Sequence, residues 1–453
     1  MLVRSTLSTL MLFIGDTVAL TLALWLTLLV RYGELPEGER LTEHFIAFTP
    51  LFLVWLLVFY MAGLYGKNVL LFKSSVLRTI VQTQFFNIVL AALYFFVMPG
   101  ITLAPKTNLV LYLIISLALM LSWRFVVFPL TTRPVSRERA ALIGSGEEVE
   151  ELMREVNSNE RYHVSLALVI DPESFEREID THIRRIGEEG ITTIIVDSQH
   201  PRVAQALPAI YGLTFEHTQY HLLELSQVYE EVFDRVPLSL LQTKWFVENV
   251  SAKTDIFYAF SKRVIDIFGA LVLGLITVVL TPIIALCMRI EGKGPLFITQ
   301  RRFGKNGAII HIYKFRSMLF SDDASKQWVK EGENKITNVG HVLRLTSIDE
   351  FPQCINILKG EMSLIGPRND IEGLGQRLQE TILYYSMRYM VTPGITGWAQ
   401  INQQYHQGNI SPQSVDETKT RLAYDFYYIK HRSLALDIEI ALKTVKRMLF
   451  RGA

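Results

Sequence analysis

Four long apolar runs fill the first part of the chain, and they constrain its fold more than any other feature. They lie near Leu7–Val30, Phe45–Tyr65, Ile80–Val97 and Leu109–Leu130. Each run is long enough to cross the hydrocarbon core of a bilayer as a helix, which takes about 20 residues. We therefore expect residues 1–132 to form a four-helix transmembrane bundle. The first run is too long for a cleaved signal, and Asp16 within it should face a neighbouring helix rather than lipid.

The distribution of basic residues predicts the orientation of this bundle. The connection Arg31–Glu43 offsets its arginines with glutamates, and the connection between the third and fourth runs has only Lys106. Cytoplasmic connections, by contrast, are enriched in Lys and Arg. Both ends of the bundle are therefore expected in the cytoplasm, because basic residues gather in the second connection, near the end of the fourth run and after it: Lys67, Lys73, Arg78, Arg124, Arg133, Arg137 and Arg139.

The composition indicates a chain that combines membrane and soluble domains. Of its 453 residues 50% are hydrophobic and 20% charged, and the mean hydropathy is +0.25. A net charge of +1 gives no electrostatic reason to expect a nucleic-acid partner. The chain has two cysteines, Cys287 and Cys354, so no disulfide framework is expected, which fits a reducing cytoplasm.

Residues 137–245 predict a small parallel α/β domain. The short β-type runs Ala140–Ile143, Val164–Ile170 and Thr192–Val196 alternate with charged, helix-prone stretches. The first run ends in Gly144-Ser145-Gly146, with Val149 where a third glycine would complete a dinucleotide fingerprint. This leaves two interpretations, a nucleotide site and a Rossmann-like scaffold without a ligand. Two aspartates at strand ends, Asp171 and Asp197, fit a ribose contact and an ordinary turn equally.

A fifth apolar run, Ile265–Met288, has positive charge on both sides. Lys262 and Arg263 precede it, and Arg289, Lys293, Arg301 and Arg302 follow it. Near its middle lies Thr281-Pro282, where the proline removes an amide and clashes with the carbonyl of Val278. A bent, re-entrant helix that returns to the cytoplasmic side explains the charges, the length and the proline. The alternative is a kinked fifth spanning helix.

The adjacent acids Asp349 and Glu350 follow Thr346 and Ser347 at capping-box spacing. Taken alone, this peptide predicts an ordinary helix start. Both acids would then lie in the first turn, where the helix dipole lowers the pKa of a carboxyl. Consecutive helical residues point about 100° apart, so one carboxylate could face a substrate while the other holds a cation.

Several neighbouring segments offer phosphate contacts. Lys314 and Arg316 would project from one face of a strand, and Gly366-Pro367-Arg368 is a rigid turn that presents a guanidinium. The glycine-rich turn Thr392–Gln400 offers backbone amides and Trp398. The final amphipathic stretch, Leu434–Phe450, fits either the headgroup layer or a core-packed terminal helix.

From Lys262-Arg263-Val264-Ile265-Asp266 to Ser433-Leu434-Ala435-Leu436-Asp437 these motifs resemble, in the same order, the bacterial sugar transferase family, the monotopic phosphoglycosyl transferases. The preceding layout is similar to the long form, the polyprenyl-phosphate hexose-1-phosphate transferases of exopolysaccharide and O-antigen initiation. The resemblance implies a catalytic domain at 258–453 with a re-entrant helix at 262–290 that is broken at Thr281-Pro282. Lys262, Arg263 and Asp266 would start that helix at the membrane interface.

The resemblance also implies a two-step reaction at the cytoplasmic face of the bacterial inner membrane. Asp349 would attack the β-phosphate of a UDP-sugar, release UMP and carry the sugar phosphate until undecaprenyl phosphate accepts it. Glu350 would bind Mg²⁺. The implied substrate contacts are Arg344, Lys314, Arg316, Arg368 and Gln400. One position departs from the family pattern, because Asn369 follows Arg368 where a proline is usual.

Two other functions stay open. A membrane-anchored sugar-nucleotide epimerase or dehydratase needs a complete glycine fingerprint and a Tyr-x-x-x-Lys pair after it, and the α/β region has neither. A non-enzymatic scaffold predicts that the acid pair can be changed without effect. The sequence does not specify the sugar, and a homodimer through the bundle or the α/β domain is one option for the assembly.

Overall fold

The computed structural model describes residues 6–62, 64–65, 73–97, 105–131, 137–159, 162, 164–216, 220–249, 256–292, 294–318, 337–404 and 412–449. Lys67, Arg133 and Lys293, which contribute to the charge argument, lie outside these residues. The chain divides into two compact units, Met1–Val232 and Phe233–Ala453.

Four long helices begin the first unit: α1 (Thr6–Tyr32), α2 (Gly38–Met61), α3 (Lys73–Val97) and α4 (Pro105–Ser122). They share one apolar core, in which Trp55 packs against Phe48 and Tyr112. Polar side chains cross this core in pairs: Trp55 Nε1 donates to the Asn87 carbonyl (2.9 Å), and Gln84 Nε2 donates to Ser116 Oγ (2.6 Å). The four apolar runs are thus helices, and each is long and apolar enough to cross a membrane.

A buried ion pair joins α1 to the end of α4. Directly after α4, residues Trp123–Val127 form a π-helix, η1, which is followed by the short helix α5 (Phe128–Thr131). From η1 the guanidinium of Arg124 pairs with both carboxylate oxygens of Asp16 and donates to the Leu64 carbonyl (2.9 Å). The expectation that Asp16 faces a helix neighbour is therefore confirmed.

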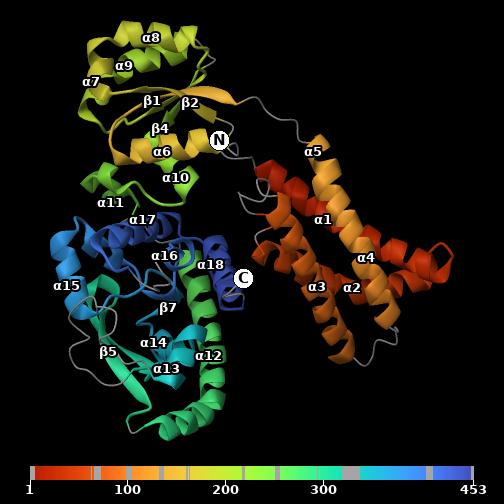
Figure 1. Ribbon diagram of the computed structural model, residues 1–453. Coiled ribbons are helices and arrows are strands. Elements are labelled where there is room, and N and C mark those ends of the chain that lie inside the picture. The colour runs from red at the N-terminus through yellow and green to blue at the C-terminus, as the bar shows by residue number, and fades with distance from the viewer. Residues whose placement is uncertain are drawn as a thin grey trace. The chain divides into compact units, whose positions relative to one another are not determined.

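The second part of this unit is a four-stranded parallel sheet in the order β2-β1-β3-β4. Figure 1 shows α8 and α9 on one face of the sheet and α6 and α10 on the other. The strands are β1 (Glu138–Ile143), β2 (Val164–Ile170), β3 (Thr193–Val196) and β4 (His221–Glu224), and the helices are α6 (Glu147–Ser158), α7 (Pro172–Arg177), α8 (Ile179–Glu188), α9 (Pro201–Glu216) and α10 (Leu225–Phe233). The three predicted strands are present. The fourth, β4, was missed because it is short and only partly buried.

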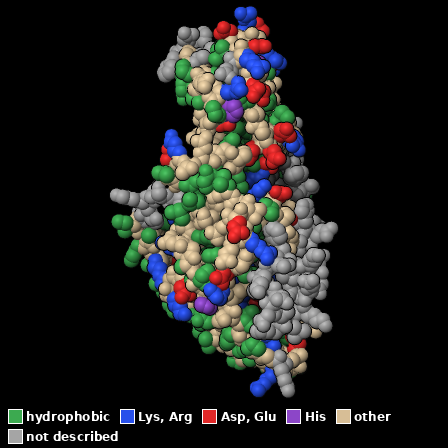
Figure 2. Space-filling view, turned by 90° about the vertical axis from the view of Figure 1, so that its left-hand side faces the viewer, with side chains coloured by type: hydrophobic (Ala, Val, Ile, Leu, Met, Phe, Trp, Pro, Cys, Tyr) green, Lys and Arg blue, Asp and Glu red, His purple; other side chains and the backbone are tan. Residues whose placement is uncertain are grey.

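The glycine loop after β1 is poorly suited to a phosphate. Gly146 has a φ of +108°, as a tight strand-to-helix turn requires, but α6 then begins with acids in its first turn. These acids, Glu147, Glu148 and Glu150, repel an anion from the helix N-terminus that would otherwise attract one. Figure 2 shows acidic and basic side chains interspersed on one face of this domain.

The two strand-end aspartates have turn roles. Asp171 caps α7, because its carboxylate accepts a hydrogen bond from the Glu173 amide (2.8 Å). Asp197 is buried and accepts one from the Gln199 amide (3.2 Å). Both contacts match the ordinary-turn interpretation.

The second unit is built on one long helix, α12 (Ile256–Glu291), which is continuous through Pro282. Figure 1 shows it changing direction toward its C-terminal end. Thr281 Oγ1 donates to the Thr277 carbonyl one turn earlier (2.6 Å). Most of the outward-facing side chains of α12 are apolar and exposed, including Val278, Val279 and Ile283. Whether the helix re-enters or spans a bilayer stays a prediction.

The rest of this unit packs around a core that contains Phe303, Tyr385, Trp398 and Phe426. The hairpin β5 (Phe297–Phe303) and β6 (Ile309–Phe315) is antiparallel, and β7 (Ser363–Ile365) pairs in parallel with β8 (Gly394–Thr396). The remaining helices are η2 (Leu238–Leu240), α11 (Thr243–Asn249), η3 (Lys305–Gly307), α13 (Asn338–Thr346), η5 (Ile348–Gln353), α14 (Cys354–Lys359), α15 (Glu372–Thr381), η6 (Tyr385–Met390), α16 (Trp398–Asn402), α17 (Val415–His431) and α18 (Leu434–Leu449).

The C-terminal amphipathic stretch forms α18 and packs into the core. Ile440 is fully buried, Asp437 bonds to Lys262, and Lys443 Nζ lies 4.6 Å from the centre of the Trp398 ring. Of the two options left by the sequence, the core-packed terminal helix is therefore the one observed.

We expect the Asp16–Arg124 pair to be strongly coupled, because removing one partner leaves an unpaired buried charge. Asp16→Asn alone should lower the free energy of unfolding by about 3–5 kcal/mol, and Asp16→Asn/Arg124→Met should lose less than the sum of the two single changes. Denaturant titration in detergent measures both. Arg154→Met, whose partner Glu150 is exposed, is the matched control and should change stability by less than about 1 kcal/mol. Additive single effects would contradict the coupling.

Candidate active site

Three polar residues in the second and third turns of α12, which begins at Ile256 and not at the predicted Lys262, attach this apolar helix to the rest of the unit. Lys262 Nζ donates to the Ile365 carbonyl (3.0 Å) and to Asp437 Oδ2 (2.8 Å). One turn later, Asp266 Oδ1 accepts from Ser363 Oγ and from the Leu364 amide, both at 2.9 Å. Arg263 donates to the carbonyls of Ile357 and Leu358 at the end of α14 (2.7 and 2.8 Å). The residues predicted to start the membrane helix thus bond α12 to β7 and α14.

The acid pair lies in a 3₁₀ helix, and the predicted capping box is wrong. Helix α13 ends at Thr346, and Ser347 adopts a left-handed conformation (φ 58°), so the chain reverses direction immediately before the acids. The Thr346 hydroxyl donates backwards to the Val342 carbonyl (2.8 Å). η5 then begins at Ile348 without a side-chain cap and places Asp349 and Glu350 in its first turn.

Glu350 is buried between two cations. Its Oε1 accepts from Lys314 Nζ (2.7 Å) and from an Arg368 terminal nitrogen (2.6 Å), and its Oε2 is 3.3 Å from the other terminal nitrogen of Arg368. Burial opposes ionisation, but Arg368 and Lys314 outweigh it and hold the pKa of Glu350 well below its usual range. Burial lowers the pKa of Lys314 to about 8, although Glu350 opposes this shift.

Asp349 differs from its neighbour in having no direct partner. The side chain is buried, yet it makes no hydrogen bond or ion pair with any residue that the structure describes. Burial raises the pKa of Asp349 above its ordinary value, against the attraction of Lys314, Arg368 and Arg344. The pKa of Glu350 is lowered as expected, but its two cations are the cause and not a helix dipole; the expectation is wrong for Asp349, where the loss of water is the larger effect.

Two of the remaining predicted contacts, Arg316 and Arg344, precede the acids in sequence. Arg344 is half-buried in the last turn of α13, and its charge acts on Asp349. Arg316 follows the end of β6, so it does not share a strand face with Lys314 as predicted. Its guanidinium lies against Gly294, where a Cβ atom would come within 1.7 Å of an Arg316 terminal nitrogen. Gly294, with a φ of +151°, leaves the space that Arg316 occupies.

The glycine-rich turn Thr392–Gln400 is hydrogen-bonded to other segments of the second unit. The Gly394 amide donates to the Pro367 carbonyl (3.0 Å), and Trp398 is buried, with Nε1 donating to the Asp234 carbonyl (2.8 Å). Of the backbone amides and the Trp that this turn was expected to offer, the Gly394 amide and the Trp398 indole therefore already have partners. Gln400 Nε2 donates to the Ile395 carbonyl (3.2 Å), and no hydrogen bond between described residues joins it to the acid pair.

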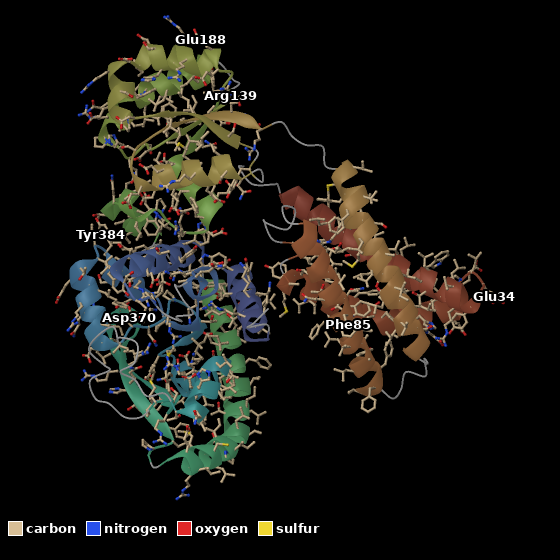
Figure 3. The ribbon with its side chains drawn as sticks, in the orientation of Figure 1. Glu34, Phe85, Arg139, Glu188, Asp370 and Tyr384 are labelled. Carbon is tan, nitrogen blue, oxygen red and sulfur yellow. The ribbon has the colours of Figure 1, made fainter. Side chains whose placement is uncertain are left out.

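A buried charge network beside the site was not identified from the sequence. Asp370, labelled in Figure 3, accepts from Tyr385 (2.9 Å), Tyr389 (2.8 Å) and Arg421 (2.6 Å), and pairs with Arg388. Arg388 also pairs with Asp425 (2.7 Å) and donates to the Arg368 carbonyl (2.7 Å). These partners come from separate segments, so no local pattern predicts the network. The one available indication was Asp425, an aspartate among the tyrosines of Tyr424–Ile429.

Asn369, the departure from the family pattern, is held by the buried Arg302. One Arg302 terminal nitrogen donates to both the backbone carbonyl (2.8 Å) and the side-chain oxygen (3.0 Å) of Asn369. The turn that carries Arg368 is therefore fixed by hydrogen bonds on its C-terminal side.

Known proteins share this site region. Residues 257–451 match the family described as bacterial sugar transferase. The chain is 31% identical to undecaprenyl-phosphate glucose phosphotransferase of Komagataeibacter xylinus over 339 residues, 71% of this chain and 61% of the relative. It is 36% identical to exopolysaccharide production protein PSS of Rhizobium leguminosarum bv. phaseoli over 198 residues, 42% of this chain and 96% of the relative.

A third relative is UDP-N-acetylgalactosamine-undecaprenyl-phosphate N-acetylgalactosaminephosphotransferase of Aeromonas hydrophila. It is 39% identical over 193 residues, which cover 42% of this chain and 44% of the relative. The chain thus covers less than two thirds of the Komagataeibacter and Aeromonas proteins and nearly all of the Rhizobium protein.

Replacing Glu350 with Gln should destabilise the metal-free protein, because Lys314 and Arg368 lose their counter-charge. The expected loss is about 3–5 kcal/mol. A carboxyl with a lowered folded-state pKa stabilises above its unfolded pKa, about 4.3, and that contribution is lost only as the pH falls below this value. Thermal unfolding should therefore show a difference between wild type and Glu350→Gln that is at least as large at pH 5.5 as at pH 7.5, because Lys314, with a pKa of about 8, is charged without its counter-charge at the lower pH.

Glu372→Gln is the matched control for this measurement. Glu372 pairs with the exposed Arg301, so its loss should change stability by less than about 1 kcal/mol. A Glu350→Gln effect that shrinks between pH 7.5 and pH 5.5 would show that the pKa of Glu350 is raised instead.

Proposed function

Because the chain belongs to the bacterial sugar transferase family, we propose that it transfers a sugar 1-phosphate from a UDP-sugar to undecaprenyl phosphate. The products are undecaprenyl-diphosphate-sugar and UMP, and the reaction is the first membrane step of exopolysaccharide, capsule or O-antigen synthesis. The printed activities of the Komagataeibacter and Aeromonas relatives support this proposal. The observation that carries it is the unequal acid pair, in which Glu350 is neutralised by two cations while Asp349 has no direct partner among the described residues.

The chemistry proceeds in two displacements at one phosphorus atom. An Asp349 carboxylate oxygen attacks the β-phosphorus of the UDP-sugar, and the bond to the bridging oxygen breaks, so that UMP leaves with the electron pair. The sugar phosphate stays on Asp349 as an acyl phosphate. A phosphate oxygen of undecaprenyl phosphate then attacks the same phosphorus and restores the Asp349 carboxylate.

The surroundings of the two acids support Asp349 as the nucleophile. Both oxygens of Glu350 have hydrogen-bond donors, whereas those of Asp349 have none among the described residues. A carboxylate that burial has partly stripped of water is more basic, and therefore more nucleophilic, than a solvated one. Lys314, Arg368 and Arg344 surround it with the positive charge that a diphosphate needs.

Glu350 is the residue that we propose for Mg²⁺. Mg²⁺ usually takes one or two protein carboxylates and completes its coordination with water and substrate phosphates. The site fits this pattern, since no group of three or more His, Cys, Asp or Glu side chains that could hold a metal occurs among the described residues. When bound, the ion supplies charge neutralisation to the diphosphate. Glu350 would then release Lys314 and Arg368, which become available for the phosphates.

We further propose that α1–α4 form a transmembrane bundle, that β1–β4 with their helices form a Rossmann-like cytoplasmic domain, and that α12 is re-entrant in the inner membrane. Five apolar helices of sufficient length support the membrane location, and the exposed apolar side chains of α12 support its burial in lipid. Pro282 within α12 supports a bend that returns the chain to the cytoplasmic face.

Purified protein in nanodiscs, with undecaprenyl phosphate and magnesium, should release UMP from one member of a panel of UDP-sugars. Asp349→Asn should reduce this release by about 10³-fold or more, because the amide cannot form the acyl phosphate. Asp416→Asn, at an exposed carboxylate on α17, is the matched control and should retain wild-type activity. UMP release quantified by chromatography identifies the donor.

The same assay separates the alternatives. An epimerase or dehydratase changes the sugar without releasing UMP. No reaction with any donor, in protein shown to be folded, would favour the scaffold function.

A further inference from the structure

The backbone on both sides of Arg368 is held by two other buried arginines. Arg302 donates to the backbone carbonyl and side-chain oxygen of Asn369 (2.8 and 3.0 Å), and Arg388 donates to the carbonyl of Arg368 (2.7 Å). We propose that Arg302 and Arg388 are positioning residues that keep the Arg368 guanidinium on Glu350, and that the Asn369 side chain supplies the contact through which Arg302 does so. This inference rests on the proposed function for its kinetic test.

The N-terminal side of this turn is rigid without help from side chains. Pro367 fixes its own φ, and its carbonyl accepts from the Gly394 amide (3.0 Å). Gly366 and Gly394 approach so closely that a Cβ atom on Gly394 would lie 2.1 Å from the Gly366 nitrogen. The chain therefore reaches Arg368 on a fixed path.

The C-terminal side has backbone support before and after Asn369. Arg368 forms an isolated parallel bridge with Gly394, and the Phe303 amide donates to the Asp370 carbonyl (3.0 Å). The Asn369 side chain is buried, and its oxygen shares one Arg302 nitrogen with the backbone carbonyl. A rotation about the Asn369 backbone would break this double contact, so Arg302 restricts the residue that follows Arg368.

The two positioning arginines are anchored differently. Arg388 pairs with Asp370 and Asp425, and these two ion pairs hold its guanidinium in place. Arg302 is in ion-pair contact with no carboxylate among the described residues, and its other donors go to Gln300 Oε1 (3.0 and 2.8 Å). A buried cation without a paired anion is unfavourable for stability alone. The position of Arg302 next to Arg368 fits a role in orienting Arg368.

The consequence for catalysis is geometric. Arg368 reaches Glu350 with both terminal nitrogens, an arrangement that needs the guanidinium plane to be correctly oriented. A displacement of about 1 Å at such a group can reduce the rate about 10²-fold. Losing the Asn369 contact should therefore impair donor turnover without removing any group that touches the donor.

The test compares Asn369→Ala with Asn369→Pro. Both variants remove the oxygen that Arg302 binds, but proline restricts the backbone φ and alanine does not. Asn369→Ala should lower kcat/KM for the UDP-sugar about 10- to 100-fold and should lower the unfolding temperature moderately, because a buried Arg302 nitrogen loses one of its two acceptors. Asn369→Pro should recover most of that loss. Arg302→Lys, which keeps the charge but not the planar fork, should resemble Asn369→Ala, whereas Arg301→Lys, at the exposed neighbour, should behave as wild type.

Wild-type kinetics for Asn369→Ala, or equal damage in the alanine and proline variants, would overturn the proposal. If the wild type releases no UMP, the proposed function fails. The positioning of Arg368 is then tested by thermal unfolding alone. A double-mutant cycle between Asn369→Ala and Glu350→Gln, read by thermal unfolding, should give non-additive effects if Asn369 acts through the Arg368–Glu350 pair. Additive effects would overturn the inference independently of activity.

Discussion

The contact of Glu350 with Lys314 and Arg368 is the interaction on which the rest of the site depends. It joins three segments that are distant in sequence: β6 through Lys314, η5 through Glu350, and the turn after β7 through Arg368. Each segment has its own support, since Asn356 bonds α14 to β6 (2.8 and 3.2 Å) and Asp266 holds β7. With Arg344, the cations around the acid pair exceed the carboxylates by one. The site therefore has excess positive charge to offer to an incoming diphosphate.

Burying an unpaired charge costs free energy, and this cost applies in the helix bundle, in the core of the second unit and at the acid pair. Three buried acids lie beside a cation: Asp16 beside Arg124, Asp370 beside Arg388 and Glu350 beside Lys314. Asp349 departs from this pattern. Its burial without a hydrogen-bond partner in the described residues is a local instability that an incoming ligand can relieve, and such departures mark functional positions.

Features that depend on short-range sequence patterns could be predicted from the sequence. Length and apolarity predicted the helices of the first unit, alternation predicted three of the parallel strands, and adjacency of two acids with basic motifs indicated the site. Properties that depend on tertiary contacts were not readable. Ser347 in a left-handed conformation ended a helix where its side chain suggested a start, and burial raised the pKa of Asp349 where a helix dipole would lower it. The Arg302 and Arg388 contacts join residues too far apart for any spacing rule.

The attachment of α12 to β7 also determines how far the acid pair lies from the apolar surface of α12. Lys262 and Asp266 bond to Ser363, Leu364 and Ile365, and the chain then reaches Arg368 after only two further residues. With α12 in the bilayer as proposed, the reacting carboxylates stand at a constant level above its apolar surface. A carrier lipid likewise keeps its phosphate at the level of the headgroups. Enzyme and lipid then meet by lateral diffusion within one plane, so the search has two dimensions instead of three.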